Sequence, residues 1–227
     1  MSSVDITVVV DAEEAARLVA EQLAEQARAG GSIVLTGGST PRRAYELATE
    51  LEPDWSHAEL WWGDERCVPP DDQNSNFRMA KEALLDRLER KPAAVHRMRG
   101  ELGRGAGADE YDRELAGVGA FDLVLLGLGP DGHVASLFPG FPTLDVTDRD
   151  VIGSDAGHEP FVDRISMTLP RLRATRQLLF LVAGEDKADA VARAFEAEQS
   201  HETPGSLVRA TGGPTRAVLD RAAASKL

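Results

Sequence analysis

Residues 121–140, with the sequence FDLVLLGLGPDGHVASLFPG, decide the fold. The stretch begins with an apolar run that is too short for an isolated helix and stops at Gly127, which is typical of a buried parallel strand. Residues 127–132 contain three glycines and a proline and therefore predict a turn. Residues 134–138 then suit a short helix, which Pro139 would end. A buried strand that runs into such a turn predicts a parallel α/β sheet.

The rest of the chain repeats this alternation of strands and helices. Further strands are expected at 6–10, 32–36, 58–62, 95–98, 151–152, 164–167 and 177–182, and helices at 15–27, 42–50, 76–90, 108–115, 168–172 and 184–195. Residues 100–107 and most of 141–163 are expected to be loops, and the segments after residue 200 are ambiguous. The pattern predicts a Rossmann-like, three-layer α/β/α fold with a mostly parallel central sheet.

The composition limits the number of domains and the kinds of partner. The chain has 227 residues, 42% of them hydrophobic, and no internal repeat or linker, so residues 1–227 are expected to form one domain. The net charge of −13 argues against nucleic acid and anionic membranes as partners, because both bind basic patches. A small anionic substrate is still compatible with it, since surface charge is screened beyond about 10 Å.

The sequence also argues against a metal, a leader segment and a membrane span. Cys67 is the only cysteine, so neither an internal disulfide nor a cysteine metal site is expected. The five histidines lack zinc-site spacing, and no cofactor is expected. The N-terminal sequence is not that of a signal peptide, and no apolar run approaches about 18 residues. We expect a cytoplasmic protein, monomeric or weakly dimeric.

Two helix starts carry recognisable signals. Asp11 is expected to cap the first helix, with Glu14 completing a capping box. Later, a strand runs directly into GGSTP at residues 37–41, where Ser39 or Thr40 is expected to cap a helix with Pro41 at its first position. Backbone N–H groups and the helix dipole at such a start can bind an anion. An ordinary strand-to-helix turn explains the residues equally well.

Asp131 and His133 are the strongest candidates for proton chemistry. A free imidazole has a pKa near 6.5 and accepts a proton from water at neutral pH, and a nearby carboxylate stabilises the imidazolium. A helix cap and a surface histidine are the alternative, but the position after a buried strand favours catalysis. Ser136 lacks the surroundings of a serine-hydrolase nucleophile.

Three further groups of charges lie near strand ends. The triplet Asp64, Glu65 and Arg66 follows a strand, where a solvated loop is the ordinary explanation. Beside an anion site, however, the arginine would suit a phosphate and a carboxylate would suit sugar hydroxyls. Arg164 and Lys187, taken singly, are typical surface charges.

Four motifs in this order resemble the 6-phosphogluconolactonase family. They are GGSTP at 37–41, WGDER at 62–66 with VP at 68–69 and NSN at 74–76, GLGPDGHVASLFP at 127–139, and RISMT at 164–168. The resemblance covers nearly the whole chain and is weakest after residue 200. It implies the sheet-and-helix fold of glucosamine-6-phosphate deaminase, no metal or cofactor, and hydrolysis of 6-phospho-glucono-1,5-lactone in the oxidative pentose phosphate pathway.

The resemblance, together with the placement of the residues, gives expected roles. His133 is the expected base, oriented by Asp131, and the substrate is a small sugar phosphate. The residues expected to bind it are Gly37, Gly38, Ser39, Thr40, Asp64, Arg66, Asn76, Gly129, Arg164 and Lys187, with backbone N–H groups of 127–132 as oxyanion donors. Asp64 or Asn76 would hold sugar hydroxyls or support Arg66.

Two other functions compete with the lactonase. The related deaminases carry Asp-Glu-Tyr where this chain has residues 64–66, and they have a glutamate shortly after the histidine, where this chain has Ser136 and no acidic residue up to Pro139. A regulator that binds sugar phosphates without catalysis would keep the anion loop and lose the base, which the intact Asp131 and His133 argue against.

Overall fold

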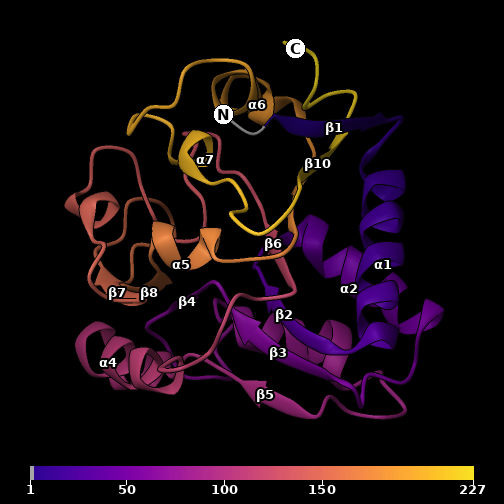
Figure 1. Cartoon of the computed structure of the whole chain (residues 1–227), viewed down its shortest axis with the longest axis vertical. Coiled ribbons are helices and arrows are strands. Elements are labelled where there is room, and N and C mark those ends of the chain that lie inside the picture. Colours follow the sequence, from indigo (N-terminus) through magenta and orange to yellow (C-terminus); the bar gives the residue numbers. More distant parts are fainter. Residues whose placement is uncertain (1–2) are drawn as a thin grey trace.

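A seven-stranded sheet forms the centre of the molecule (Figure 1). The computed structural model describes residues 3–227. The strands of the sheet, in the order in which they lie side by side, are β1 (Val4–Val9), β10 (Thr215–Asp220), β9 (Leu178–Val182), β6 (Leu123–Leu126), β2 (Gly31–Leu35), β3 (Ala58–Trp62) and β5 (Ala94–His96). Every neighbouring pair is parallel. The predicted parallel sheet is therefore confirmed.

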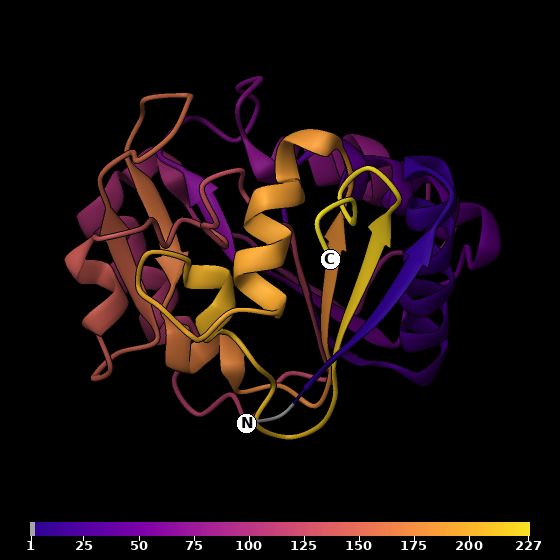
Figure 2. The same cartoon turned by 90° about the horizontal axis from the view of Figure 1, so that it is seen from above.

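A smaller antiparallel sheet lies on the side of the molecule away from β1 (Figure 2). Its strands, in spatial order, are β4 (Asp64–Arg66), β8 (Arg164–Met167) and β7 (Val151–Ser154). The sequence suggested a solvated loop for 64–66, and this interpretation is wrong. Asp64 and Glu65 are buried, because β4 pairs with β8.

Helices cover both faces of the large sheet, which gives the predicted three layers (Figures 1 and 2). α1 and α2 lie on one face, and α5 and α6 lie on the other. The helices are α1 (Ala12–Ala29), α2 (Ser39–Leu51), α3 (Asn76–Ala80), α4 (Arg104–Glu114), α5 (Leu169–Arg173), α6 (Ala188–Phe195) and α7 (Pro204–Leu207). No helix within residues 3–227 is long and apolar enough to cross a bilayer.

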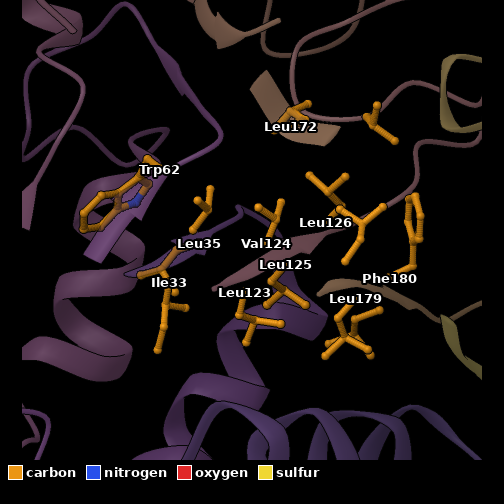
Figure 3. Close-up of a cluster of buried hydrophobic side chains, with 14 of the residues drawn as sticks. Ile33, Leu35, Trp62, Leu123, Val124, Leu125, Leu126, Leu172, Leu179 and Phe180 are labelled. Atoms are coloured by element: carbon orange, nitrogen blue, oxygen red, sulfur yellow. The ribbon is translucent and has the colours of Figure 1, made fainter. Parts of the chain in front are cut away.

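The central strands are continuous apolar runs because both of their faces are buried in the core. All four residues of β6 are buried, since helices pack on both faces of the sheet. Figure 3 shows side chains of β2, β6 and β9 between α5, represented by Leu172, and the helices of the opposite face. At the edge of the molecule, Asp11 caps α1 as expected and accepts the N–H of Glu14 at 2.9 Å. The expected capping box is altered, because Glu14 accepts the N–H of Val10 at 3.0 Å rather than that of Asp11.

The start of α2 differs from the expected capping pattern. Gly38, rather than Ser39 or Thr40, is the capping residue, and no side chain caps the helix. Its φ of 114° lies in a region that glycine adopts freely. Pro41 consequently lies within the first turn, and the N–H groups of Ser39 and Thr40 have no partner within the helix.

Helix α4 begins inside the segment that the glycines suggested to be a loop. Gly103, with a φ of 79°, is its N-cap. A Cβ at Gly107 would overlap the Cδ1 atom of Ile165 on β8, so this glycine allows close packing. Gly103 therefore starts this helix, and Gly107 lets it pack against β8.

Two other predicted helices are also corrected. The helix predicted for 76–90 comprises α3 and one π-helical turn, Lys81–Leu85, where the N–H of Asp86 donates to the carbonyl oxygen of Lys81 at 2.8 Å. Residues 134–138 form turns. Ala135 has a φ of 49°, which a helix does not allow, and the N–H of Ser136 donates to the Ser166 hydroxyl at 3.2 Å.

The order of strands reverses beside β2. The chain passes from β2 to β3 and β5 on one side, and then returns to β6, β9 and β10 on the other. A parallel α/β sheet opens a crevice at the carboxyl ends of the strands where such a reversal occurs. The loops that follow β2 and β6 are the two that carry the predicted anion-binding and proton-transfer residues.

Candidate active site

Loops from four neighbouring strands, β9, β6, β2 and β3, contribute to a cleft of ≈ 460 Å³. Most of the residues predicted for the site line this cleft: Gly37, Gly38, Ser39, Thr40, Asp64, Arg66, Asn76, Gly129, His133, Arg164 and Lys187. Asp131 is hydrogen-bonded to the His133 ring. The structure therefore brings the predicted residues together, while the role of each stays a prediction.

The glycine loop, residues 37–40, forms one wall of the cleft. Among residues 3–227, no hydrogen bond uses the N–H groups of Gly38, Ser39 or Thr40, because they precede and open α2. A Cβ at Gly37 would overlap the side-chain amide of Asn76, so only glycine allows this close approach. Free N–H groups at the positive end of a 13-residue helix suit an anion.

Asp64 and Asn76 form a buried polar cluster behind the loop. The Asn76 side chain donates to the Asp64 carboxylate at 3.1 Å and to its carbonyl oxygen at 3.0 Å. Ser136 donates to the same carboxylate at 2.6 Å. Asp64 is thereby fixed in position. The alternative in which these residues support Arg66 does not match the structure, since Arg66 donates to the carbonyl oxygen of Asn74 at 2.6 Å.

Glu65 has a structural position that sequence analysis did not single out. Its carboxylate is buried and accepts the N–H groups of Arg66, Asn76 and Phe77 and the Ser75 hydroxyl at 2.7–3.0 Å. Burial raises the pKa of Glu65, and these donors oppose that rise. Glu65 thus holds the start of α3, which positions Asn76.

Arg66 and Arg164 are direct cross-strand neighbours in β4 and β8. Arg164 is only 2% exposed, which excludes the surface position expected for it from the sequence. Two like charges at opposed positions are unfavourable without an anion between or beside them. Burial, followed by the charge of Arg66, lowers the pKa of Arg164.

The Arg164 guanidinium has hydrogen-bonding capacity to spare. Its Nη2 donates to the carbonyl oxygens of His158 and Pro160 at 2.9 and 2.7 Å. Its Nε and Nη1 have no partner among the described residues, although buried N–H groups are usually hydrogen-bonded. Because Arg164 lines the cleft, these unsatisfied donors favour an anionic ligand there. Lys187, which pairs with Asp186 at 3.0 Å, adds a third cation.

His133 and Asp131 form a close pair on the turn after β6. Asp131 Oδ1 contacts the ring Nδ1 at 2.6 Å and accepts the backbone N–H of His133 at 3.1 Å. No hydrogen bond within residues 3–227 uses Nε2, which is therefore the ring nitrogen available to a ligand. Partial burial favours a higher pKa for Asp131, but the hydrogen bond and charge of His133 outweigh it and lower that pKa to about 2. Asp131 is thus ionised at neutral pH and fixes the ring.

The turn at 127–132 supplies fewer free N–H groups than expected. The N–H of Gly129 donates to the His133 carbonyl oxygen, and the N–H of Gly132 donates to the Gly129 carbonyl oxygen, both at 2.9 Å. These two groups are therefore unavailable to an oxyanion. Leu128 lines the cleft, and its N–H has no partner among the described residues.

His158 and Glu159 were not predicted, yet both line the cleft. The His158 ring lies 5.8 Å from the His133 ring, measured between centroids. Both residues belong to an irregular segment without a recognisable motif, so no signal in the sequence pointed to them. In the structure, the hydrogen bonds from Arg164 hold this segment beside the cleft. No cluster of three or more His, Cys, Asp or Glu side chains within residues 3–227 is arranged to hold a metal ion.

The fold and the cleft together define a class: a parallel α/β protein with a proton-transfer pair and a cationic pocket for a small anion. Residues 10–217 match the family described as glucosamine-6-phosphate isomerases/6-phosphogluconolactonase. The chain belongs to this family, as the four sequence motifs indicated.

Individual relatives agree with this assignment. The chain is 42% identical over 235 residues to the 6-phosphogluconolactonase of Streptomyces coelicolor, covering 94% of this chain and 88% of that protein. The solved structure of 6-phosphogluconolactonase from Trypanosoma brucei superposes with a TM-score of 0.88 at 26% identity, covering 100% of both chains. A monomeric glucosamine-6-phosphate deaminase shares the fold, with a TM-score of 0.87 at 19% identity, covering 98% of this chain and 100% of that one.

Proposed function

We propose that this chain is a carboxylic ester hydrolase that converts 6-phospho-D-glucono-1,5-lactone to 6-phosphogluconate, the second step of the oxidative pentose phosphate pathway. The named lactonase relatives support the reaction. The observation that carries it is that one cleft contains both a carboxylate-bound imidazole and a buried arginine with unsatisfied donors.

The phosphate group would bind at the glycine loop. The free N–H groups of Ser39 and Thr40 supply neutral donors there, and Arg66, Arg164 and Lys187 supply charge. A dianion would satisfy the Nε and Nη1 donors of Arg164 and relieve its repulsion with Arg66. Binding energy from this remote group orients the lactone for reaction.

His133 would act as the general base. Its Nε2 takes a proton from water as the water oxygen bonds to C1 of the lactone. Asp131 keeps Nδ1 protonated and stabilises the imidazolium that forms. Collapse of the tetrahedral intermediate breaks the bond between C1 and the ring oxygen, which takes the proton back from Nε2. General base catalysis of this kind contributes about 10²–10⁴-fold.

The developing oxyanion needs donors that face the cleft. The N–H of Leu128 is a candidate on the turn after β6, whereas those of Gly129 and Gly132 are already bonded. Asp64, fixed by Asn76 and Ser136, would accept hydrogen bonds from sugar hydroxyls. Each of these steps uses only groups of the chain and water.

A coupled assay with freshly made lactone tests the proposal. With spontaneous hydrolysis subtracted, we expect turnover of the lactone and no ammonia from glucosamine 6-phosphate. His133→Ala should lower kcat by about 10²-fold or more and change KM little. Binding of 6-phosphogluconate without lactone turnover would instead indicate a regulator, and near-normal turnover of the variant would remove His133 from its role.

We further propose that residues 1–227 act as one domain. One hydrophobic cluster includes residues of the large sheet, such as Leu35 and Leu126, together with Val151 and Ile165 of the small sheet. Limited proteolysis that released a stable fragment would contradict this.

A further inference from the structure

Tyr45 is a fully buried residue of α2 that contacts the backbone beside the cleft. Its hydroxyl accepts the N–H of Thr36 at 2.9 Å and donates to the carbonyl oxygen of the same residue at 2.8 Å. Thr36 follows β2 and precedes Gly37. One side chain therefore holds both polar groups of the residue at which the strand becomes the glycine loop.

Within residues 3–227, no other hydrogen bond is made by the backbone of Thr36 or Gly37. The nearest fixed points are Leu35, whose carbonyl oxygen accepts the N–H of Gly63 at 3.0 Å, and Gly38, whose carbonyl oxygen accepts the N–H of Arg42 at 3.0 Å. Between them lie two residues, one of which is a glycine. Among the described residues, the Tyr45 hydroxyl is thus the hydrogen-bonding partner of the backbone between Leu35 and Gly38, where β2 leads into the glycine loop.

We propose that Tyr45 is a positioning residue that holds the glycine loop in the conformation that binds the substrate phosphate. The inference rests on the proposed function, because it takes a phosphorylated lactone as the ligand. A loop that is fixed before binding avoids the cost of ordering it during binding. Loss of the hydroxyl should therefore weaken phosphate binding. The Asp131–His133 pair, which follows a different strand, should be left in place.

Tyr111 provides a matched control, since it is the only other tyrosine in the chain. It is also buried, and its hydroxyl accepts the N–H of Trp62 and donates to the carbonyl oxygen of His96, both at 2.9 Å. Gly63, which follows Trp62, is held by two further hydrogen bonds: its N–H donates to Leu35 at 3.0 Å, and its carbonyl oxygen accepts from Met167 at 2.8 Å. The loop after β3 therefore does not depend on its tyrosine.

The test compares wild type, Tyr45→Phe and Tyr111→Phe in three measurements. The first is kcat and KM for 6-phospho-glucono-1,5-lactone, the second is the Kd for inorganic phosphate by calorimetry, and the third is Tm. Both variants should lower Tm. Tyr45→Phe should raise KM and the phosphate Kd about tenfold, with kcat within about twofold of wild type. Tyr111→Phe should leave KM and Kd within about twofold.

Unchanged KM and phosphate affinity in Tyr45→Phe would overturn the proposal, as would equal changes in the two variants. A Tyr45→Phe protein that fails to fold while Tyr111→Phe folds would assign the hydroxyl to general stability and would also overturn it. If wild type does not hydrolyse the lactone, the proposed function fails. The phosphate Kd of the variants then still decides whether Tyr45 positions an anion-binding loop.

Discussion

The substitution Gly129→Ala tests how strictly the position of the imidazole controls the rate. A Cβ at residue 129 would overlap Nδ1 and Cε1 of His133 and would lie 2.6 Å from Asp131 Oδ1. The backbone of Gly129 is held by two hydrogen bonds of the turn, so the ring has to move. Relief of the overlap needs a shift of about 1 Å, and a misplacement of that size costs about 10²-fold in rate. The corresponding rise in the activation barrier is about 2.7 kcal/mol.

The assay measures kcat for the lactone under saturating conditions, together with Tm. Gly119→Ala is the control, because a Cβ there meets nothing within 4 Å and residue 119 does not line the cleft. We expect Gly129→Ala to lose about 10²-fold in kcat with KM changed only a few-fold, and Gly119→Ala to keep wild-type kinetics. A kcat for Gly129→Ala within about threefold of wild type would refute the reasoning.

Three further substitutions address binding, pH dependence and stability. Arg66→Ala should raise KM about tenfold or more, because a charge-assisted hydrogen bond contributes about 1.5–3 kcal/mol; an unchanged KM would remove Arg66 from the phosphate site. The pKa of Asp131 is lowered to about 2 in the folded state from its usual value of 3.8, so its contribution to stability is present above pH 3.8 and is lost as the pH falls through 2. Asp131→Asn should therefore reduce the decrease in Tm between pH 5 and 2, and an unaltered decrease would contradict this assignment. Asp11→Ala removes the cap of α1 and should lower the free energy of unfolding by about 1 kcal/mol in urea denaturation, with kcat unchanged; a loss of activity would show that α1 also affects the cleft.

The central strands could be predicted from the sequence because their signal is local. An apolar run such as 121–126 fits a strand buried on both faces whatever its neighbours are. The glycines of 100–107 were misleading for the opposite reason. Gly107 allows α4 to pack closely against Ile165, a residue distant in the chain, so local turn propensity gave the wrong structure.

The site could be predicted where its residues follow strands directly. Gly37 and His133 come after β2 and β6, and parallel strands bring their carboxyl ends together. The partners of Arg164 could not be predicted, since its neighbour Arg66 is set by pairing between β4 and β8, almost 100 residues apart in sequence. His158 reaches the cleft through an irregular segment, for which no periodicity exists.

The guanidinium of Arg164 has one further consequence. Its Nη2 donates to the backbone carbonyl oxygens of His158 and Pro160, while Nε and Nη1 have no partner among the described residues. If an anion binds these donors, its binding and the order of that segment would be thermodynamically linked, each favouring the other to the same extent. Protease cleavage within 155–163 should slow when inorganic phosphate is added, and cleavage at an unchanged rate would contradict the linkage. Through Arg164, the protease sensitivity of 155–163 would then indicate whether an anion is bound in the cleft.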